Sequence, residues 1–186
     1  VKPQAMRAVC AGLAGHVGEA LVVSIAAGIT CDQLGSWLGT EAVVRCMPNT
    51  PALLGAGATG LFATPQVGAR QRGAAEALLA AVGRCVWVER EPHMDAVTAL
   101  SGSGPAYVFL LAEAMQDAGV AMGLEPESAT LLVNQTLLGA ARMLDESGES
   151  AAVLRQRVTS PGGTTQAALE TFEQGGLRRL VQDALA

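Results

Sequence analysis

The sequence predicts an α/β sheet domain followed by an all-α domain. Short runs of apolar and β-branched residues, typical of buried strands, occur at residues 20–25, 43–47, 58–63 and 85–88. Residues 66–82, between the last two runs, are rich in Ala and interrupted by Arg and Glu, which predicts a helix. Alternating strands and helices are typical of a sheet whose strands are joined by crossovers.

After about Glu91 the strand signals stop, and the remaining segments have helical character. We expect helices over residues 93–100, 105–122, 127–146, 150–158 and 165–173. Pro105 suits a helix start and Gly123 follows a helix end, while Ser128 and Thr165 are candidate N-caps. The domain boundary is therefore expected near residue 92, between a sheet domain over 1–92 and a helical domain over 93–186.

Charge and hydropathy argue against two classes of partner. The net charge is −5 and no basic cluster occurs, which argues against nucleic acid. No apolar run approaches the roughly 18–20 residues that a membrane span needs. We therefore expect neither nucleic acid nor a membrane as partner.

Four cysteines are scattered along the chain without a CxxC pair, at Cys10, Cys31, Cys46 and Cys85. Together with the two histidines they supply no recognisable metal-ligand spacing, so we expect no metal site. Because cysteine is among the most buried residue types, we interpret them as reduced, structural thiols of a cytoplasmic protein.

A dinucleotide-binding fingerprint, G-x-G-x-x-G, is matched by Gly55-Ala-Gly57-Ala-Thr-Gly60. That motif binds a pyrophosphate only where it joins a strand to a helix. Here it leads into residues 58–63, which are predicted to be a strand, and no acidic residue follows at the usual distance. We therefore reject it as a phosphate loop and interpret it as a flexible lead-in to a strand.

Small or backbone-rich residues follow three predicted strand ends, at Val1-Lys2-Pro3, Ala26-Ala27-Gly28 and Met47-Pro48-Asn49-Thr50-Pro51. The first of these lacks an initiator methionine and resembles the end of a buried strand, so we expect the natural protein to continue upstream of Val1. Ligands of open α/β sheets bind at the carboxyl ends of the strands. Small residues there would let a flat ring approach the main chain, and Asn49 or Thr50 could hydrogen-bond a carboxamide. Ordinary turns are the alternative interpretation.

The sharpest local motif is Val158-Thr-Ser160-Pro-Gly-Gly163-Thr164-Thr165, which precedes a predicted helix. Backbone N–H groups, hydroxyl donors and the positive end of a helix dipole together favour an anion site. Because no Lys is present, a carboxylate suits it better than a polyphosphate. The alternative is a plain helix cap.

No nucleophile–base pair and no paired carboxylates stand out elsewhere. The break between two predicted helices at Leu100-Ser-Gly-Ser-Gly-Pro105 is expected to be structural, its glycines allowing close packing. Hydride transfer is compatible with this absence, since a cofactor then carries the chemistry and the protein orients it.

Taken in order, five segments resemble the pyrroline-5-carboxylate reductase family, and the resemblance extends over nearly the whole chain. They are Val1-Lys2-Pro3, Ser24-Ile-Ala-Ala-Gly28, Arg45-Cys-Met-Pro-Asn-Thr-Pro51, Leu100-Ser-Gly-Ser-Gly-Pro-Ala-Tyr107 and Val158-Thr-Ser-Pro-Gly-Gly-Thr-Thr165. The resemblance implies that residues 1–92 are the C-terminal part of a Rossmann NAD(P)-binding domain. It implies that residues 93–186 are a helical substrate-binding and dimerisation domain, in an enzyme that reduces pyrroline-5-carboxylate to proline.

The resemblance also implies residue roles. The nicotinamide of NADP or NAD would lie near Val1, Lys2, Pro3, Ala26, Ala27 and Gly28, with Asn49 and Thr50 as neighbours. The substrate carboxylate would be held by Ser160, Gly162, Gly163, Thr164 and Thr165. Thr165 resembles the threonine near the imine nitrogen, which orients the imine or donates a proton, so it is the candidate catalytic residue.

Members of the family dimerise through their helical domains, and some build rings of dimers, so the resemblance implies a homodimer or a ring of dimers. It places the true glycine-rich turn upstream of Val1, so residues 1–186 alone are expected to have little activity. Two alternatives stay open: another imine or β-hydroxyacid reductase of the same two-domain plan, or a non-catalytic helical dimerisation fragment.

Overall fold

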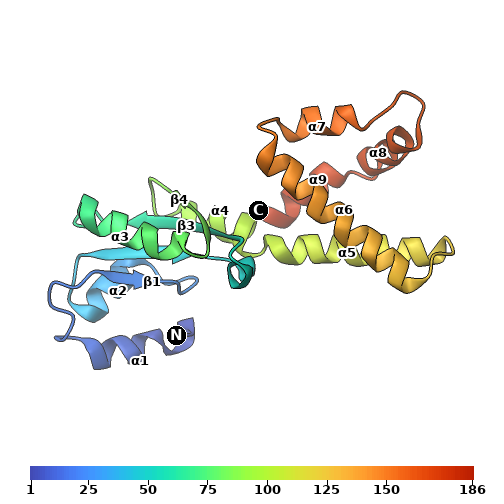
Figure 1. Ribbon diagram of the computed structural model, residues 1–186. Helices are drawn as coiled ribbons and strands as arrows, with labels where there is room; N and C mark the ends of the chain where they lie inside the picture. Colours follow the sequence, from blue (N-terminus) through green and yellow to red (C-terminus); the bar gives the residue numbers. More distant parts are fainter. The chain divides into compact units, whose positions relative to one another are not determined.

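The computed structural model describes all residues 1–186, which divide into two compact units, Val1–Pro105 and Ala106–Ala186. The first unit contains a four-stranded sheet in the order β1-β2-β3-β4, and the second unit is helical (Figure 1). The predicted class, α/β followed by all-α, is confirmed.

The sheet of the first unit is mixed. It consists of β1 (Val22–Ser24), β2 (Val43–Met47), β3 (Gly57–Ala63) and β4 (Gly83–Trp87). The pairs β1–β2 and β3–β4 are parallel, whereas β2–β3 is antiparallel. The expectation of crossovers is therefore wrong at β2–β3, where only the one-turn 3₁₀ helix η1 (Thr50–Leu54) connects the strands. A parallel connection needs a dozen or more residues, and this link is too short.

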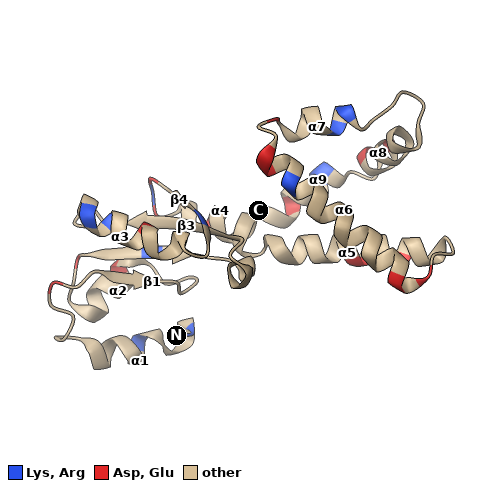
Figure 2. Cartoon of the chain, viewed as in Figure 1, with Lys and Arg blue, Asp and Glu red and all other residues tan.

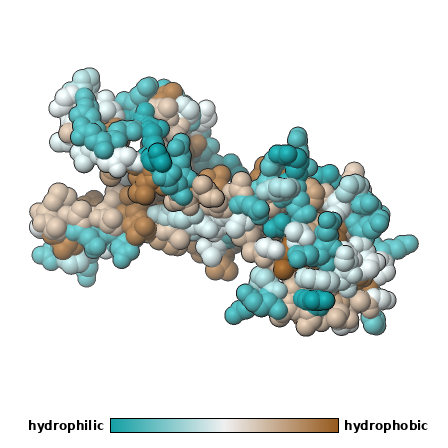
Figure 3. All heavy atoms as spheres, turned by 180° about the vertical axis from the view of Figure 1, so that it is seen from behind, coloured by the Kyte–Doolittle hydropathy of each residue, from teal (hydrophilic) through white to brown (hydrophobic).

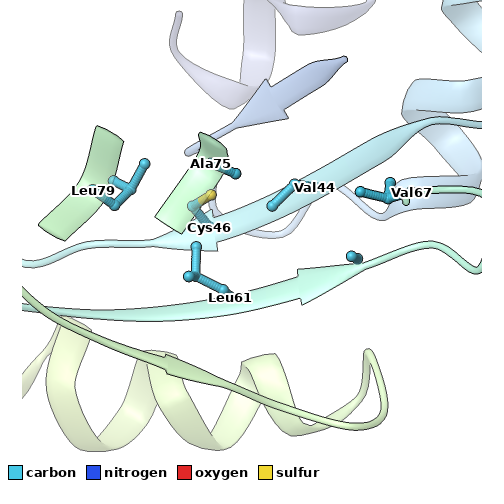
Figure 4. Close-up of a cluster of buried hydrophobic side chains, with 7 residues drawn as sticks. Val44, Cys46, Leu61, Val67, Ala75 and Leu79 are labelled. Carbon is cyan, nitrogen blue, oxygen red and sulfur yellow. The ribbon is translucent and has the colours of Figure 1, made fainter. Parts of the chain in front are cut away.

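Helices cover both faces of the sheet, and alternate residues of β2 point to opposite faces. On one face, α1 (Pro3–Leu13) and α2 (Cys31–Leu38) bury a cluster that includes Val43. On the other face, α3 (Ala69–Ala80) packs over Val44 and its neighbours. Figure 4 shows this second cluster, formed by Val44, Cys46, Leu61, Ala63, Val67, Ala75 and Leu79.

Val1 and Lys2 precede helix α1, which begins at Pro3, whose ring suits the first helical position, and which was not predicted. The backbone of Lys2 is extended, and the interpretation of Val1-Lys2-Pro3 as the end of a strand stays a prediction. Helix α2 was also not predicted, although its signal is present: the Thr30 hydroxyl accepts from the Gln33 N–H, and the Gln33 side chain accepts from the Thr30 N–H.

Along the chain after β4, α4 (His93–Val97) continues into the π-helix η2 (Thr98–Gly102). Both pack against β3, and a Cβ on Gly60 would lie only 2.5 Å from Val97 Cγ1. Because of this packing, α4 and η2 belong to the first compact unit, which ends at Pro105. The expected domain boundary near residue 92 stays a prediction.

The helical unit contains most of α5 (Gly104–Ala121), and α6 (Pro126–Glu146), α7 (Ala151–Arg157), α8 (Thr164–Gln174) and α9 (Leu177–Leu185). Two predicted N-caps are wrong, because α6 begins with Pro126 after Glu125, and Gly163 rather than Thr165 precedes α8. Helix α9 was not predicted. None of the helices combines the length and hydrophobicity that crossing a lipid bilayer requires.

Apolar side chains remain uncovered on this unit. Apart from Glu113 and Asp117, α5 carries no charged residue (Figure 2). Its residues Val108, Phe109, Leu110 and Leu111 are between 46% and 66% exposed, and further apolar residues of α6 and α9 are exposed as well. The space-filling view shows brown apolar patches among the polar surface (Figure 3). A helix that is apolar all round is normally buried. We therefore expect another protein surface to pack against these exposed residues.

One buried ion pair connects three elements of the first unit. The Arg45 guanidinium on β2, 7% exposed, donates to Glu91 Oε1 at 3.1 Å. The same oxygen accepts the N–H of Cys31, the first residue of α2, at 2.8 Å. Glu91 therefore ties the segment before α4 to both the sheet and the start of α2.

Replacing Glu91 by Ala should lower the free energy of unfolding by about 3–5 kcal/mol, because the buried Arg45 would lose its close partner. Urea unfolding followed by tryptophan fluorescence measures this, since Trp37 and Trp87 both lie in the first unit. The exposed Glu89 is the matched control, and Glu89→Ala should change stability by no more than about 0.5 kcal/mol. A loss under about 1 kcal/mol in Glu91→Ala would contradict the assigned role of the pair.

Candidate functional site

The carboxyl ends of β1 and β2 lie at the same edge of the sheet, because the two strands are parallel and Ser24 is level with Arg45. The turn after β1 is held by a hydrogen bond from the Ala26 N–H to Ser24 Oγ at 3.3 Å. Ala26 is buried, whereas Ala27 and Gly28 are exposed, and Gly28 has φ of 73°. Small exposed residues therefore follow β1 at this edge, and the binding of a flat ligand there stays a prediction.

Asn49, in the turn after β2, is engaged within the protein. Its side-chain Nδ2 donates to the Ser101 carbonyl at 3.1 Å, and its Oδ1 accepts the Ala58 N–H at 2.9 Å. The side chain therefore fastens this turn to β3 and to η2, and one Nδ2–H is left for a ligand. The neighbouring Thr50 is exposed at the start of η1.

Two further segments bear on cofactor binding: the glycine match at residues 55–60, which we rejected as a phosphate loop, and Val1-Lys2-Pro3, which we assigned to the nicotinamide pocket. Gly55 ends η1 and Gly57 begins β3, so the G-x-G-x-x-G match does lead into a strand, and its rejection as a phosphate loop is confirmed. Val1, Lys2 and Pro3 precede or begin α1, which packs on α2, and no hydrogen bond or ion pair connects them to the ends of β1 and β2. Their role stays a prediction.

These residues fit only one end of a dinucleotide cofactor. The edge beyond β1 and β2 carries small exposed residues, the kind that a nicotinamide ring could approach. No glycine-rich turn from a strand into a helix exists among residues 1–186 that could hold the pyrophosphate.

The second candidate region is the glycine-rich loop before α8, defined here as residues 160–163. The Gly163 N–H donates to the Ser160 carbonyl at 3.0 Å, Pro161 follows Ser160, and Gly162 has φ of 71°. This combination is a type II turn, with Pro at the second position and Gly at the third. The helix then begins at Thr164.

Several hydrogen-bond donors at this loop have no partner within the protein. The N–H groups of Thr164 and Thr165 lie in the first turn of α8, where no intrahelical acceptor exists. The hydroxyls of Ser160, Thr164 and Thr165 make no hydrogen bond, so the interpretation of Thr165 as a cap is wrong. The loop contains no charged residue, and free N–H groups at a helix N-terminus suit an anion.

Two residues that stabilise this loop were missed from the sequence. At its start, the Thr159 hydroxyl donates to the Arg155 carbonyl at 2.6 Å. At its end, Gln166 Oε1 accepts the Gly162 N–H at 2.8 Å, and Gln166 Nε2 donates to Glu170 Oε1 at 2.7 Å. The spacing of Gln166 and Glu170, four residues apart on one helix, was the available signal. Both line a cavity of about 370 Å³ bordered by residues of α7 and α8.

Cys31 and Cys46 are two of the buried thiols. Burial, reinforced by the nearby Glu91 carboxylate, raises the pKa of Cys31 to about 12, and burial likewise raises the pKa of Cys46 to about 12. Both thiols are therefore protonated and poor nucleophiles near neutral pH. No group of three or more His, Cys, Asp or Glu side chains converges on a point that could hold a metal ion.

Comparison with known proteins places the chain clearly. Residues 91–186 match the family model described as pyrroline-5-carboxylate reductase dimerisation. The chain is 57% identical to the pyrroline-5-carboxylate reductase of Pseudomonas aeruginosa, over all of this chain and 68% of that protein. It is 43% identical to the corresponding protein of Arabidopsis thaliana, over all of this chain and 67% of that protein.

Solved structures agree. A pyrroline-5-carboxylate reductase from Coxiella burnetii superposes with a TM-score of 0.95 at 48% identity, covering all of this chain and 70% of that one. A pyrroline carboxylate reductase from Plasmodium falciparum, solved with NADP bound, superposes with a TM-score of 0.90 at 32% identity, covering all of this chain and 75% of that one.

Proposed function

The chain belongs to the pyrroline-5-carboxylate reductase family, and we propose that it reduces the C=N bond of L-1-pyrroline-5-carboxylate to L-proline with NAD(P)H, the last step of proline biosynthesis. The observation that carries the proposal is the loop before α8, where unpaired N–H and hydroxyl donors surround a helix N-terminus. A small cyclic imine with one carboxylate matches that donor set. Lysine or arginine, which a polyphosphate would favour, is absent from the loop.

The loop binds and orients the substrate. The carboxylate accepts from the N–H groups of Thr164 and Thr165, which carry the positive end of the α8 dipole, and from the hydroxyls of Ser160 and Thr164. Gly163, the N-cap, has no Cβ that could obstruct the anion. Gly162 supplies the positive φ of the turn. The carboxylate is thus fixed without a salt bridge.

Reduction of C=N adds a hydride to carbon and requires a proton on nitrogen. The reduced nicotinamide of NADPH or NADH, once bound, supplies the hydride. We assign to the Thr165 hydroxyl a hydrogen bond with the ring nitrogen, which orients the imine and assists its protonation. This group is free to act because it makes no bond within the protein.

The sheet edge of the first unit is the proposed place of the nicotinamide. Ala26, Ala27 and Gly28 form one side and Thr50 another, while Asn49 has one N–H left for the carboxamide. Val1, Lys2 and Pro3 remain proposed members of the same pocket. Both NADP and NAD are candidate cofactors.

The chain forms a homo-oligomer through its dimerisation region, and we propose a homodimer or a ring of dimers. The exposed apolar residues of α5 support this proposal. A second copy would bury these side chains. Each fully buried Leu or Phe side chain would stabilise the oligomer by roughly 1.5–3 kcal/mol.

Turnover of pyrroline-5-carboxylate with NADPH and with NADH, measured by absorbance at the nicotinamide band in the complete gene product, tests the proposed function. Cofactor oxidation that depends on the substrate and forms proline is expected. Cofactor oxidation with other cyclic imines or β-hydroxyacid-derived ketones, but none with pyrroline-5-carboxylate, would refute the assigned substrate.

Thr165→Val removes the hydroxyl and keeps the shape. If the hydroxyl contacts the ring nitrogen more strongly in the transition state, kcat should fall roughly tenfold to several hundredfold, for a contact worth about 1.5–3 kcal/mol. Thr164→Val is the matched control and should act mainly on KM. Because Thr165 does not cap α8, the melting temperature should hardly change, and an unchanged kcat would end the catalytic assignment.

Leu110→Glu should reduce self-association, because it places a charge on the uncovered apolar surface of α5. Light scattering at micromolar concentration is expected to show at least a dimer for the parent protein and a smaller species for the variant. Leu78→Glu on α3 is the control, since the two leucines are 64% and 66% exposed. A parent protein that is purely monomeric, or equal effects of both variants, would contradict the assigned interface.

A further inference from the structure

We propose that Gln166 is a positioning residue for substrate binding, because it holds the Pro161–Gly162 peptide in one orientation. The proposal rests on the proposed function and deepens it. Its basis is one contact: Gln166 Oε1 accepts the Gly162 N–H at 2.8 Å. That N–H belongs to the central peptide of the turn formed by residues 160–163.

The central peptide is the part of this turn that can move. Type I and type II turns share their end-to-end hydrogen bond and differ mainly by a flip of the central peptide, which exchanges the directions of its C=O and N–H. The bond between Gly163 N–H and the Ser160 carbonyl, at 3.0 Å, is compatible with both. Glycine at position 162 can adopt either φ, so the local sequence leaves the flip open.

Gln166 removes that freedom. In the observed orientation its side-chain oxygen receives an N–H, whereas after a flip it would face the Pro161 carbonyl oxygen, and two acceptors would oppose each other. The Gln166 amide cannot simply turn around to offer its NH₂, because Nε2 already donates to Glu170 Oε1 at 2.7 Å. Glu170, four residues later on α8, therefore fixes the polarity of the Gln166 side chain.

This arrangement divides the loop's donors into two groups. The Gly162 N–H is used internally, so Gly162 contributes to carboxylate binding through its conformation and not as a donor. The free donors are the N–H groups and hydroxyls of Thr164 and Thr165, with the Ser160 hydroxyl. A flipped peptide would turn the Pro161 carbonyl dipole around beside these donors, and so alter the field at the carboxylate.

The test uses Gln166→Met, which keeps the chain length and removes the acceptor, in the complete gene product. KM for pyrroline-5-carboxylate should rise about 3- to 10-fold, the effect of one neutral hydrogen bond. KM for NADPH should stay within about twofold, since no donor of the cofactor edge is altered. Gln174→Met, the same substitution at the exposed far end of α8, where the side chain makes no hydrogen bond, is the matched control, with KM expected within about twofold of the parent value.

A second readout does not depend on turnover. In protein labelled with ¹⁵N-glycine, the Gly162 amide should exchange with solvent about tenfold faster or more in Gln166→Met, because its acceptor is lost. The same amide should be unchanged in Gln174→Met. Melting temperatures of both variants check that the fold persists.

The outcomes separate the two claims. No turnover of pyrroline-5-carboxylate by the parent protein would refute the proposed function and the substrate role of Gln166 with it. In an active protein, an unchanged KM in Gln166→Met refutes the positioning role alone, even with faster amide exchange. Unchanged exchange refutes the contact itself. A raised KM together with faster exchange, both confined to Gln166→Met, supports the proposal.

Discussion

The helical unit depends on the burial of one apolar helix, α5, whose side chains the rest of the unit leaves largely exposed to water. Helix α5 has two charged residues in 18 positions, and four successive side chains, Val108 to Leu111, are largely exposed. Helix α5 approaches α6 closely at Gly119, where an added Cβ would lie 3.3 Å from Ala129 Cβ. The unit therefore buries few side chains by itself, and association with a second copy completes its core.

The candidate binding loop belongs to this helical unit, and the hydrogen bonds that hold the loop come from neighbouring residues of the chain. Thr159 closes the end of α7, Gln166 and Glu170 hold the turn from α8, and Gly163 opens the helix. In the proposed function, N–H dipoles at the start of α8 would meet the carboxylate without rearrangement. The protein would then contribute orientation and electrostatics, and the cofactor would carry the hydride chemistry.

Much of this could be predicted from the sequence, and the failures have physical reasons. Strand β2 was predicted with its observed limits, because the run Val43 to Met47 is apolar except for Arg45 and is ended by Pro48. The glycine match at residues 55–60 was correctly rejected from its context. Strand β3 was predicted over residues 58–63, but its antiparallel direction was not, since strand direction depends on connection length and not on side-chain pattern. The internal bonds of Asn49 and the engagement of the Gly162 N–H depend on contacts that residue types alone do not reveal.

The central claim is that the loop before α8 recognises the carboxylate of a cyclic imine. Comparing kcat/KM for pyrroline-5-carboxylate with that for 1-pyrroline, the same ring without its carboxylate, tests it most directly. Loss of hydrogen bonds to a charged group, at about 1.5–3 kcal/mol each, predicts a preference for the carboxylate of roughly tenfold to more than a hundredfold. Equal kcat/KM for the two imines would contradict the account, because the free donors of residues 160–165 would then serve no substrate group.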